Sequence, residues 1–180
     1  MTRLRILEYP DPRLRRRAEP VRKFDADLAQ QIDDLLDTLH ASRGIGLAAP
    51  QVGLAQRIIV IDLSAGASEP EVFINPEIVS ADRLGLVEES CLSVPGICDT
   101  VRRATRLRVR SHRRDGDAFT SQVDGMLAVC VQHEIDHLEG RLFIDRLPFF
   151  RRWKARRQLA RRVATKQLDE NPAPGSLTAR

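Results

Sequence analysis

The sequence predicts an α+β fold built as a single domain, and three observations carry that prediction. A length of 180 residues suits one hydrophobic core. The hydrophobic and charged fractions, 42% and 30%, are those of a globular chain and exclude a disordered one. Strand patterns fill the middle of the chain, and helical patterns lie toward both ends, as in α+β proteins.

Three segments have helical patterns. In residues 25–40 apolar side chains recur every three or four positions, and a glycine follows as a terminator. A second helix is expected to open at residue 124 or 125 and to run to about 138. A third is expected over about 149–168, because Pro148 suits the first turn of a helix.

The strands are expected between these helices. Residues 57–63 are a β-branched run typical of a buried strand, and 71–79 predict one or two short strands around Asn75. Residues 44–53 are expected to form a loop or irregular edge, and 114–117 a turn. Residues 101–111 alternate, which predicts a strand whose inner face carries Val101, Ala104, Leu107 and Val109.

The cysteines and the N-terminal segment bear on the compartment. An odd count of three cysteines without paired spacing argues against a disulfide framework and favours a reducing compartment. The basic start is interrupted by Glu8 and Asp11 and has no apolar h-region, so no signal peptide is predicted. No apolar run approaches the roughly 20 residues that span a bilayer. We therefore expect a cytoplasmic protein without a membrane partner.

The strongest chemical signal is the run His-Glu-Ile-Asp-His at residues 133–137. Two histidines four positions apart on a helix can reach one metal ion, and Glu134 lies beside them, near enough to take a proton from water. Met126 and Cys130 fall on the same helical stripe, which we expect to face inward. The alternative is an amphipathic helix with two hydrogen-bonded core histidines.

A hydrolytic metal site needs a third protein ligand. One zinc protease class has a histidine where this chain has Phe143. Another class takes a glutamate from further on, but Glu139 is too close and Glu170 lies at the edge of the tail. An upstream ligand is left, and Cys91 is the best candidate. Its alternative is a small buried hydrophobic residue.

Three motifs then stand in order: Gly44-Ile-Gly-Leu-Ala-Ala-Pro-Gln51, Glu89-Ser-Cys-Leu-Ser93 and Gln132-His-Glu-Ile-Asp-His137. Together they resemble the peptide deformylase family over residues 4–147. The resemblance implies a catalytic domain over 1–168, with antiparallel strands packed around a central helix that carries His-Glu-x-x-His. It also implies removal of the formyl group from the N-terminal methionine of nascent chains.

The resemblance implies a role for each motif residue. Cys91, His133 and His137 would be the metal ligands, with Glu134 as general acid and base. Gln51 and the backbone N–H of Leu92 would donate to the oxyanion, although Gln51 read alone could equally cap local backbone. The implied metal is ferrous iron (Fe2+), with Zn2+ or Ni2+ able to replace it.

A further set of residues is expected to bind the substrate. The backbone of the first motif can pair with an extended peptide, although a plain turn is the alternative. A methionine side chain needs an apolar slot, and Ile45, Val129 and Cys130 are the candidates for its wall. Core packing of these three residues is the alternative. The expected substrate-binding residues are Gly44, Ile45, Gly46, Glu89, Ser90, Val129 and Cys130.

Three positions depart from the family pattern. Ser90 replaces the usual glycine before the ligand cysteine and would strain the loop if that position needs a positive φ. Cys98 stands where some members carry arginine near the substrate. Arg102 replaces a frequent proline. None of these changes removes a catalytic group.

The C-terminal helix is strongly basic. Residues 151–166 carry eight arginines or lysines and no acid. Trp153, Ala160 and Val163 form a narrow apolar stripe that we expect to dock on the body. We expect the basic face to bind ribosomal RNA, the polyanion where nascent chains emerge, and the alternative is a solvated charged face. Residues 169–180 are expected to be a disordered tail.

Two other functions remain open from the residues. A zinc endopeptidase could use the same His-Glu-x-x-His helix and would cleave internal bonds of unformylated proteins. A non-catalytic RNA-binding module would bind nucleic acid through the basic helix and hold no metal. Metal content per chain, measured beside formate release from formyl-Met-Ala-Ser without oxygen, distinguishes all three.

Overall fold

The computed structural model describes residues 3–64 and 70–170, with side chains given to residue 165. The α+β prediction is confirmed, with a five-stranded antiparallel sheet and three α-helices. The elements in chain order are η1 (Pro12–Arg15), α1 (Ala26–Ser42), β1 (Gly46–Ala48), η2 (Ala49–Val52), β2 (Ile58–Ile61), β3 (Glu71–Cys91), β4 (Val94–His112), β5 (Ala118–Asp124), α2 (Gly125–Leu138), η3 (Phe143–Arg146) and α3 (Phe149–Glu170).

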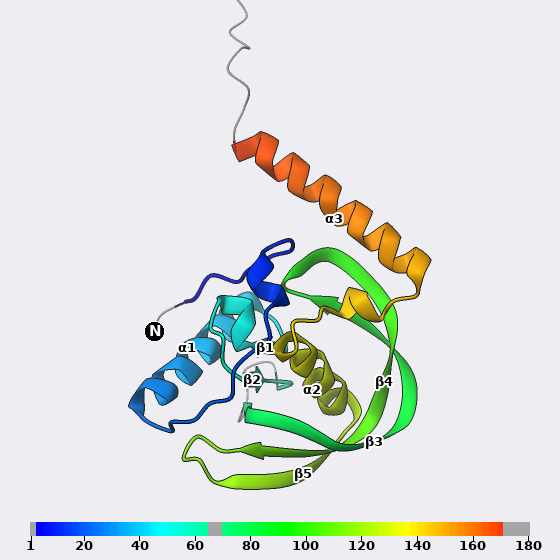
Figure 1. Cartoon of the computed structure of the whole chain (residues 1–180). Helices are drawn as coiled ribbons and strands as arrows, with labels where there is room; N and C mark the ends of the chain where they lie inside the picture. The colour runs from blue at the N-terminus through cyan, green and yellow to red at the C-terminus, as the bar shows by residue number, and fades with distance from the viewer. Residues whose placement is uncertain (1–2, 65–69, 171–180) are drawn as a thin grey trace, which may run out of the picture.

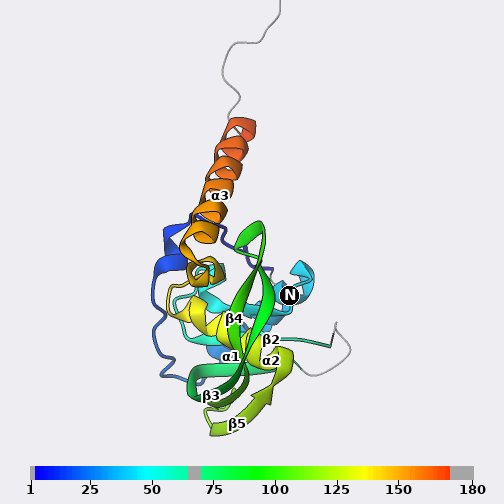
Figure 2. The same cartoon turned by 90° about the vertical axis from the view of Figure 1, so that its right-hand side faces the viewer.

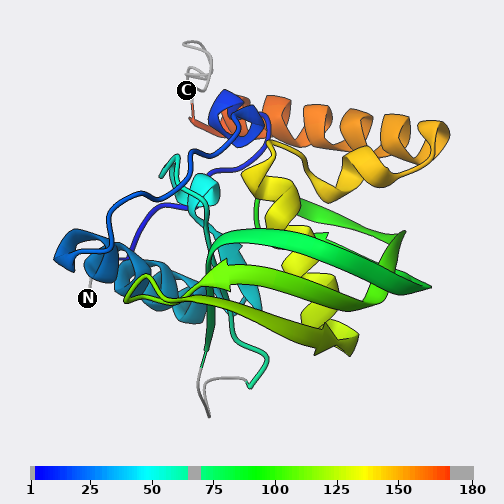
Figure 3. The same cartoon turned by 60° about the horizontal axis from the view of Figure 1, so that its bottom comes forward.

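The sheet has the order β1-β2-β3-β4-β5, and every neighbouring pair is antiparallel. β3 and β4 form a long hairpin whose last pair is Cys91 and Val94. Its strands curve around α2, which lies in the middle of the molecule (Figure 1). In Figure 3 the green strands of this hairpin and β5 lie in front of the yellow α2. The hairpin thereby carries Cys91 toward the helix.

Strand β2 separates two hydrophobic clusters. Its four residues are at most 1% exposed, because successive side chains point to opposite faces of the sheet. Ile59 and Ile61 pack in the cluster that contains α2, whereas Ile58 and Val60 pack in the cluster that contains α1. The two helices therefore cover opposite faces of the sheet at β2.

The predicted helices and the inner face of β4 are confirmed. α1 begins after the Asp25 N-cap, whose side chain accepts a hydrogen bond from the Leu28 N–H at 3.1 Å. It ends at Arg43 in the left-handed region, with φ of 57°, so the terminator is one residue before the expected glycine. The four inner-face residues predicted for β4 are all buried.

The strand predictions need correction in three places. Residues 44–53 are not only a loop, since they contain β1 and the 3-10 turn η2. Residues 71–79 are the first part of a strand that continues to Cys91. β5 was not predicted. Most side chains of β3 after residue 76 and of β5 are exposed or half-buried, so pairing with β4 defines these strands where the hydrophobic pattern is weak.

Helix α3 lies along one end of the body, as Figures 1 and 2 show. The predicted docking stripe is wrong in two of its three members, because Trp153 is 54% exposed and Ala160 is exposed. Ala155 and Leu159 are buried instead, one helical turn apart, with Val163 half-buried one turn further on.

The C-terminal helix is longer than the sequence predicts. The helix continues to Glu170, so residues 169 and 170 are helical and not part of a disordered tail. The remainder of the predicted tail, 171–180, lies outside the described residues. Within the described part of the chain, no helix is long and apolar enough to cross a membrane.

Candidate metal centre and active site

Helix α2 and the tip of the β3–β4 hairpin bring the three predicted ligands together. The four-residue spacing puts His133 and His137 on one face of α2, with ring centroids 5.2 Å apart. Cys91, the last residue of β3, lies with its Sγ 3.2 Å from His137 Nε2. One ligand atom from each of the three residues lies within 4.8 Å of the others.

These residues fit a divalent metal ion. A thiolate and two imidazoles form a three-ligand set that leaves a coordination position open for water or substrate. His133 Nδ1–H donates to Glu89 Oε2 at 2.8 Å, which leaves its other ring nitrogen for a metal, and this is the usual support of a ligating histidine. Burial holds the pKa of His137 well below its ordinary value. A neutral imidazole is the form that binds metals.

Glu134 lies in a buried position beside these ligands. Its side chain is 4% exposed, and its Oε2 has no hydrogen-bond partner among the described residues. Burial raises its pKa to about 7, against the attraction of His133. A Cβ added to Gly46 would lie 2.5 Å from Glu134 Oε1, so only glycine at this position of β1 gives the carboxyl group room. The predicted catalytic and peptide-pairing residues are therefore in contact.

Gln51 is buried beside Cys91, and hydrogen bonds hold both the oxygen and the nitrogen of its side-chain amide. Its Oε1 accepts from the Ala48 N–H at 2.8 Å, so the local backbone cap weighed from sequence exists. Its Nε2 donates to Ser93 Oγ at 3.1 Å and lies 3.8 Å from Cys91 Sγ. The cap thus orients the amide N–H groups toward the predicted ligand.

Glu89, expected from sequence at the substrate, lies buried behind His133. Both carboxylate oxygens accept from Arg103, at 2.7 and 2.9 Å. Burial opposes ionisation, but hydrogen bonds from Arg103 and His133 outweigh it and lower the pKa of Glu89 to about 2. Its carboxylate oxygens therefore bind Arg103 and the predicted ligand His133.

The remaining predicted substrate residues are spread over three elements. Ile45, just before β1, is 49% exposed, and Ser90 is exposed next to Cys91. Val129 and Cys130 are 4% and 5% exposed on α2, and burial raises the pKa of Cys130 to about 12. Gly44 lies close to Leu92 of the second motif, since a Cβ on Gly44 would lie 2.9 Å from Leu92 Cδ1.

One expectation about this region is wrong, and one condition stated from sequence does not arise. Met126 was placed on the inward stripe of the metal helix, but it is 51% exposed because it lies in the first turn of α2, near the end of the sheet. Ser90 was expected to strain the loop if its φ were positive. Its φ is not positive, so no such strain arises. Ser90 pairs with Cys98, the exposed second departure, immediately before a register shift between Ser90 and Cys91.

The other ligand candidates weighed from sequence have different partners. Glu139 accepts from Arg57 at 2.7 Å and forms an ion pair with Arg17 at 2.9 Å. The Phe143 ring stacks on His133, with centroids 6.1 Å apart, and so walls the site. Asp136, inside the motif itself, is buried and paired with Arg103, a contact that the sequence reasoning missed.

Comparisons with known proteins agree with this geometry. Residues 3–153 match the family described as polypeptide deformylase. The chain is 49% identical to a peptide deformylase of Chromobacterium violaceum, over 90% of this chain and 97% of that one. It is 48% identical to one of Neisseria meningitidis, with the same coverages.

Solved structures give the same answer. The fold superposes on a peptide deformylase of Legionella pneumophila with a TM-score of 0.86 and 45% identity, covering 92% of this chain and 98% of that one. A peptide deformylase of Synechococcus elongatus, solved with actinonin, gives 0.83 and 38%, over 87% and 88%. The chain belongs to the polypeptide deformylase family.

Proposed function

We propose that this chain removes the formyl group from the N-terminal formyl-methionine of newly synthesised proteins and releases formate, with Cys91, His133 and His137 holding the metal. The observation that carries the proposal is the convergence of these three side chains beside a buried glutamate. Family membership supports the reaction, and the thiolate ligand replaces the downstream ligand that an endopeptidase on this helix would need.

The side chains around the ligands supply proton transfer and charge stabilisation. When bound, a divalent metal makes water nucleophilic at neutral pH and polarises the formyl oxygen. Glu134 accepts the proton of the attacking water and then protonates the leaving amine. The Gln51 amide and the Leu92 N–H donate to the oxygen that becomes negative as the formyl carbon turns tetrahedral.

The first motif is suited to hold the peptide. β1 is the edge strand of the sheet, so its outer backbone groups can pair with an extended chain. We assign the backbone of Gly44, Ile45 and Gly46 to this pairing and Val129 and Cys130 to the wall of the methionine slot. The formyl group is small, and we expect a tight pocket beside the fixed Gln51 amide to exclude larger acyl groups.

The substrate assignment predicts a sharp difference between two peptides. Protein prepared without oxygen should release formate from formyl-Met-Ala-Ser and leave acetyl-Met-Ala-Ser uncleaved. A free amino terminus, detected by a fluorogenic amine reagent, measures both reactions. Equal cleavage of the two peptides, or cleavage of internal bonds in an unformylated protein, would contradict the assignment.

We assign the native metal as Fe2+, with Zn2+ and Ni2+ as substitutes. A thiolate and two imidazoles bind several divalent ions, so the ligand set alone does not identify the metal. The metal assignment is therefore tested by how long each metal form keeps its activity. Air should inactivate the iron form fastest, because ferrous iron and its thiolate ligand are both oxidised, whereas nickel or zinc protein should keep activity longer. Equal half-lives of the three forms in air, followed by formate release, would contradict iron as the native metal.

We also propose that α3 docks the enzyme on ribosomal RNA in the cytoplasm, where nascent chains emerge. Two of its basic residues pair with acids of the body, Arg151 with Asp99 at 3.0 Å and Arg156 with Asp145 at 3.1 Å. Arg157 lies over the Trp153 ring, 5.3 Å from its centroid.

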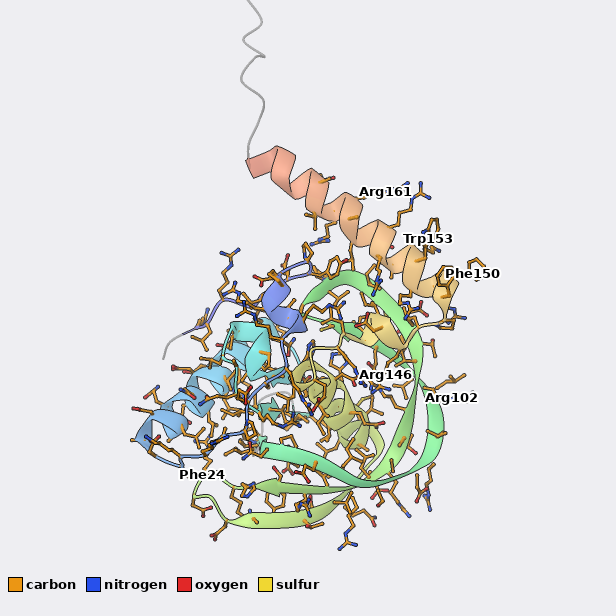
Figure 4. All side chains as sticks on the ribbon, in the orientation of Figure 1. Phe24, Arg102, Arg146, Phe150, Trp153 and Arg161 are labelled. Carbon is orange, nitrogen blue, oxygen red and sulfur yellow. The ribbon has the colours of Figure 1, made fainter. Side chains whose placement is uncertain are left out.

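Exposed aromatic side chains add a second feature to this surface. Phe149, Phe150 and Trp153 are 66%, 81% and 54% exposed. Figure 4 shows Phe150, Trp153 and Arg161 pointing away from the body. Arginines interleaved with exposed aromatic rings suit RNA with unpaired bases, since rings stack on bases and guanidinium groups pair with phosphates.

Docking is best tested by charge reversal, because truncation after Pro148 would remove buried Ala155 and Leu159 from their cluster. Arg157→Glu with Arg161→Glu should lower ribosome co-sedimentation about tenfold or more at low salt and leave hydrolysis of short formyl peptides unchanged. Quenching of Trp153, the only tryptophan in the sequence, reports the same contact.

A matched control reverses two exposed arginines elsewhere, Arg22→Glu with Arg108→Glu. The control should bind ribosomes far better than the α3 double variant. Equal binding by both double variants would refute docking through α3.

A further inference from the structure

We propose that Arg103 is a positioning residue for the metal centre, fixing the ligand His133 through Glu89 while being fixed itself by Asp136. This inference rests on the proposed role of His133 as a ligand. None of these three supporting residues has to touch the metal or the substrate.

The contacts form a closed circuit that starts and ends on α2. Arg103 Nε and Nη2 donate to Glu89 Oε1 and Oε2, at 2.7 and 2.9 Å. Arg103 Nη1 donates to Asp136 Oδ2 at 2.7 Å. Glu89 Oε2 in turn accepts from His133 Nδ1–H at 2.8 Å. Since Asp136 lies three residues after His133, the circuit ties the two positions of the helix together through β4 and β3.

The Arg103 side chain is fully buried, so its charge has to be compensated by the hydrogen bonds to both acids. It has 0% exposure, and Glu89 and Asp136 each have 5%. A charged group in such surroundings is tolerated only when it is paired and hydrogen-bonded. Asp136 has a second cation, Arg146, at 2.5 Å from each oxygen, so two carboxylates face two guanidinium groups.

Only arginine can make this arrangement. Its planar fork meets both oxygens of one carboxylate, and a further N–H group remains for a second acid. The bidentate contact holds the Glu89 carboxylate in one plane, with Oε2 aimed at the His133 ring. That hydrogen bond sets the rotation of the ring and the nitrogen that carries the proton, so the other nitrogen faces Cys91 and His137. A lysine would keep the positive charge, but it could not make the bidentate contact that holds the Glu89 carboxylate in one plane.

The test compares Arg103→Lys with Arg106→Lys, a matched change on the same strand. Arg106 makes an exposed ion pair with Asp124 at 2.6 Å and has no contact with the circuit. Co2+ affinity by chelator competition and the Co2+ absorption spectrum are measured, together with thermal unfolding of the metal-free proteins. We expect Arg103→Lys to weaken Co2+ binding about 10- to 100-fold and to alter the spectrum, and Arg106→Lys to change neither.

A double variant separates positioning from general damage. Glu89→Gln should weaken Co2+ binding by a similar factor. The double variant, Glu89→Gln with Arg103→Lys, should bind Co2+ no more weakly than whichever single variant binds it less well. The reason is that both changes act through one hydrogen bond to His133. Independent, additive losses would overturn the proposal.

Two further outcomes are decisive. Unchanged Co2+ affinity in folded Arg103→Lys protein overturns the positioning role. If that variant does not unfold cooperatively, Asp136→Asn, which leaves the Arg103–Glu89 pair in place, is measured instead. A loss of affinity supports the circuit, and an unchanged affinity overturns it. Undiminished binding by His133→Ala would instead show that the proposed ligand set is wrong.

Discussion

Replacing Cys91 by serine, or either His133 or His137 by alanine, is expected to strip the protein of most of its metal and of its activity. Each change removes one of three ligands that lie within 4.8 Å of one another. A site left with two ligands loses much of its affinity, and serine is a far weaker ligand than a thiolate. Metal per chain, measured by atomic absorption on purified protein, should fall from near one to a small fraction.

Two residues outside the centre give the matched controls for this prediction. Cys98→Ser changes an exposed cysteine of β4, and His40→Ala changes a histidine hydrogen-bonded to Asp62 at 2.8 Å, outside the metal cluster. Both proteins should hold as much metal as the unchanged chain. Full metal loading of Cys91→Ser would refute the ligand assignment.

Replacing Glu134 by alanine is expected to leave the metal in place and to abolish turnover. Glu134 follows His133 directly but is not in the ligand cluster, and its carboxyl group lies against Gly46. Removing a positioned acid and base costs roughly 100- to 10,000-fold in rate. Formate release at saturating formyl-Met-Ala-Ser should therefore fall by several orders of magnitude, with the fall in kcat.

The control for Glu134 is a change that keeps its shape. Glu134→Gln fills the same space beside Gly46 but cannot carry the proton, so it should be as inactive as Glu134→Ala while holding full metal. Normal turnover by either variant would contradict the mechanism. Metal loss in both variants would show that Glu134 supports the metal instead.

The helices and the placement of the two motif histidines on one helical face agree with the prediction, for a physical reason. α1 and α2 carry apolar residues at helical spacing, and the His-Glu-x-x-His run places its chemistry on one helical face without help from the remainder of the chain. Cys91 was found by the chemistry of a missing ligand, and the structure brings it to the histidines.

The remainder of the site depends on contacts between distant segments, which local patterns do not contain. Arg102 and Arg103 are neighbours on β4, so their side chains point to opposite faces, and Arg103 is the buried one. The local pattern does not contain its acid partners, Glu89 and Asp136, which come from distant segments. The stripe of α3 was misread for the same reason, since Trp153 is the largest apolar residue there but the body contacts Ala155 and Leu159. Only the first part of β3, residues 71–79, was predicted, because most side chains of its continuation to Cys91 are exposed.

The most direct test of the central claim is formate release before and after metal removal. Anaerobically prepared protein is assayed with formyl-Met-Ala-Ser, stripped with a chelator, assayed again, and restored with one equivalent of Fe2+ per chain. We predict one formate per cleaved peptide, loss of activity on stripping and recovery on restoration, with no recovery for Cys91→Ser. Formate release that persists after the metal is gone would contradict the account.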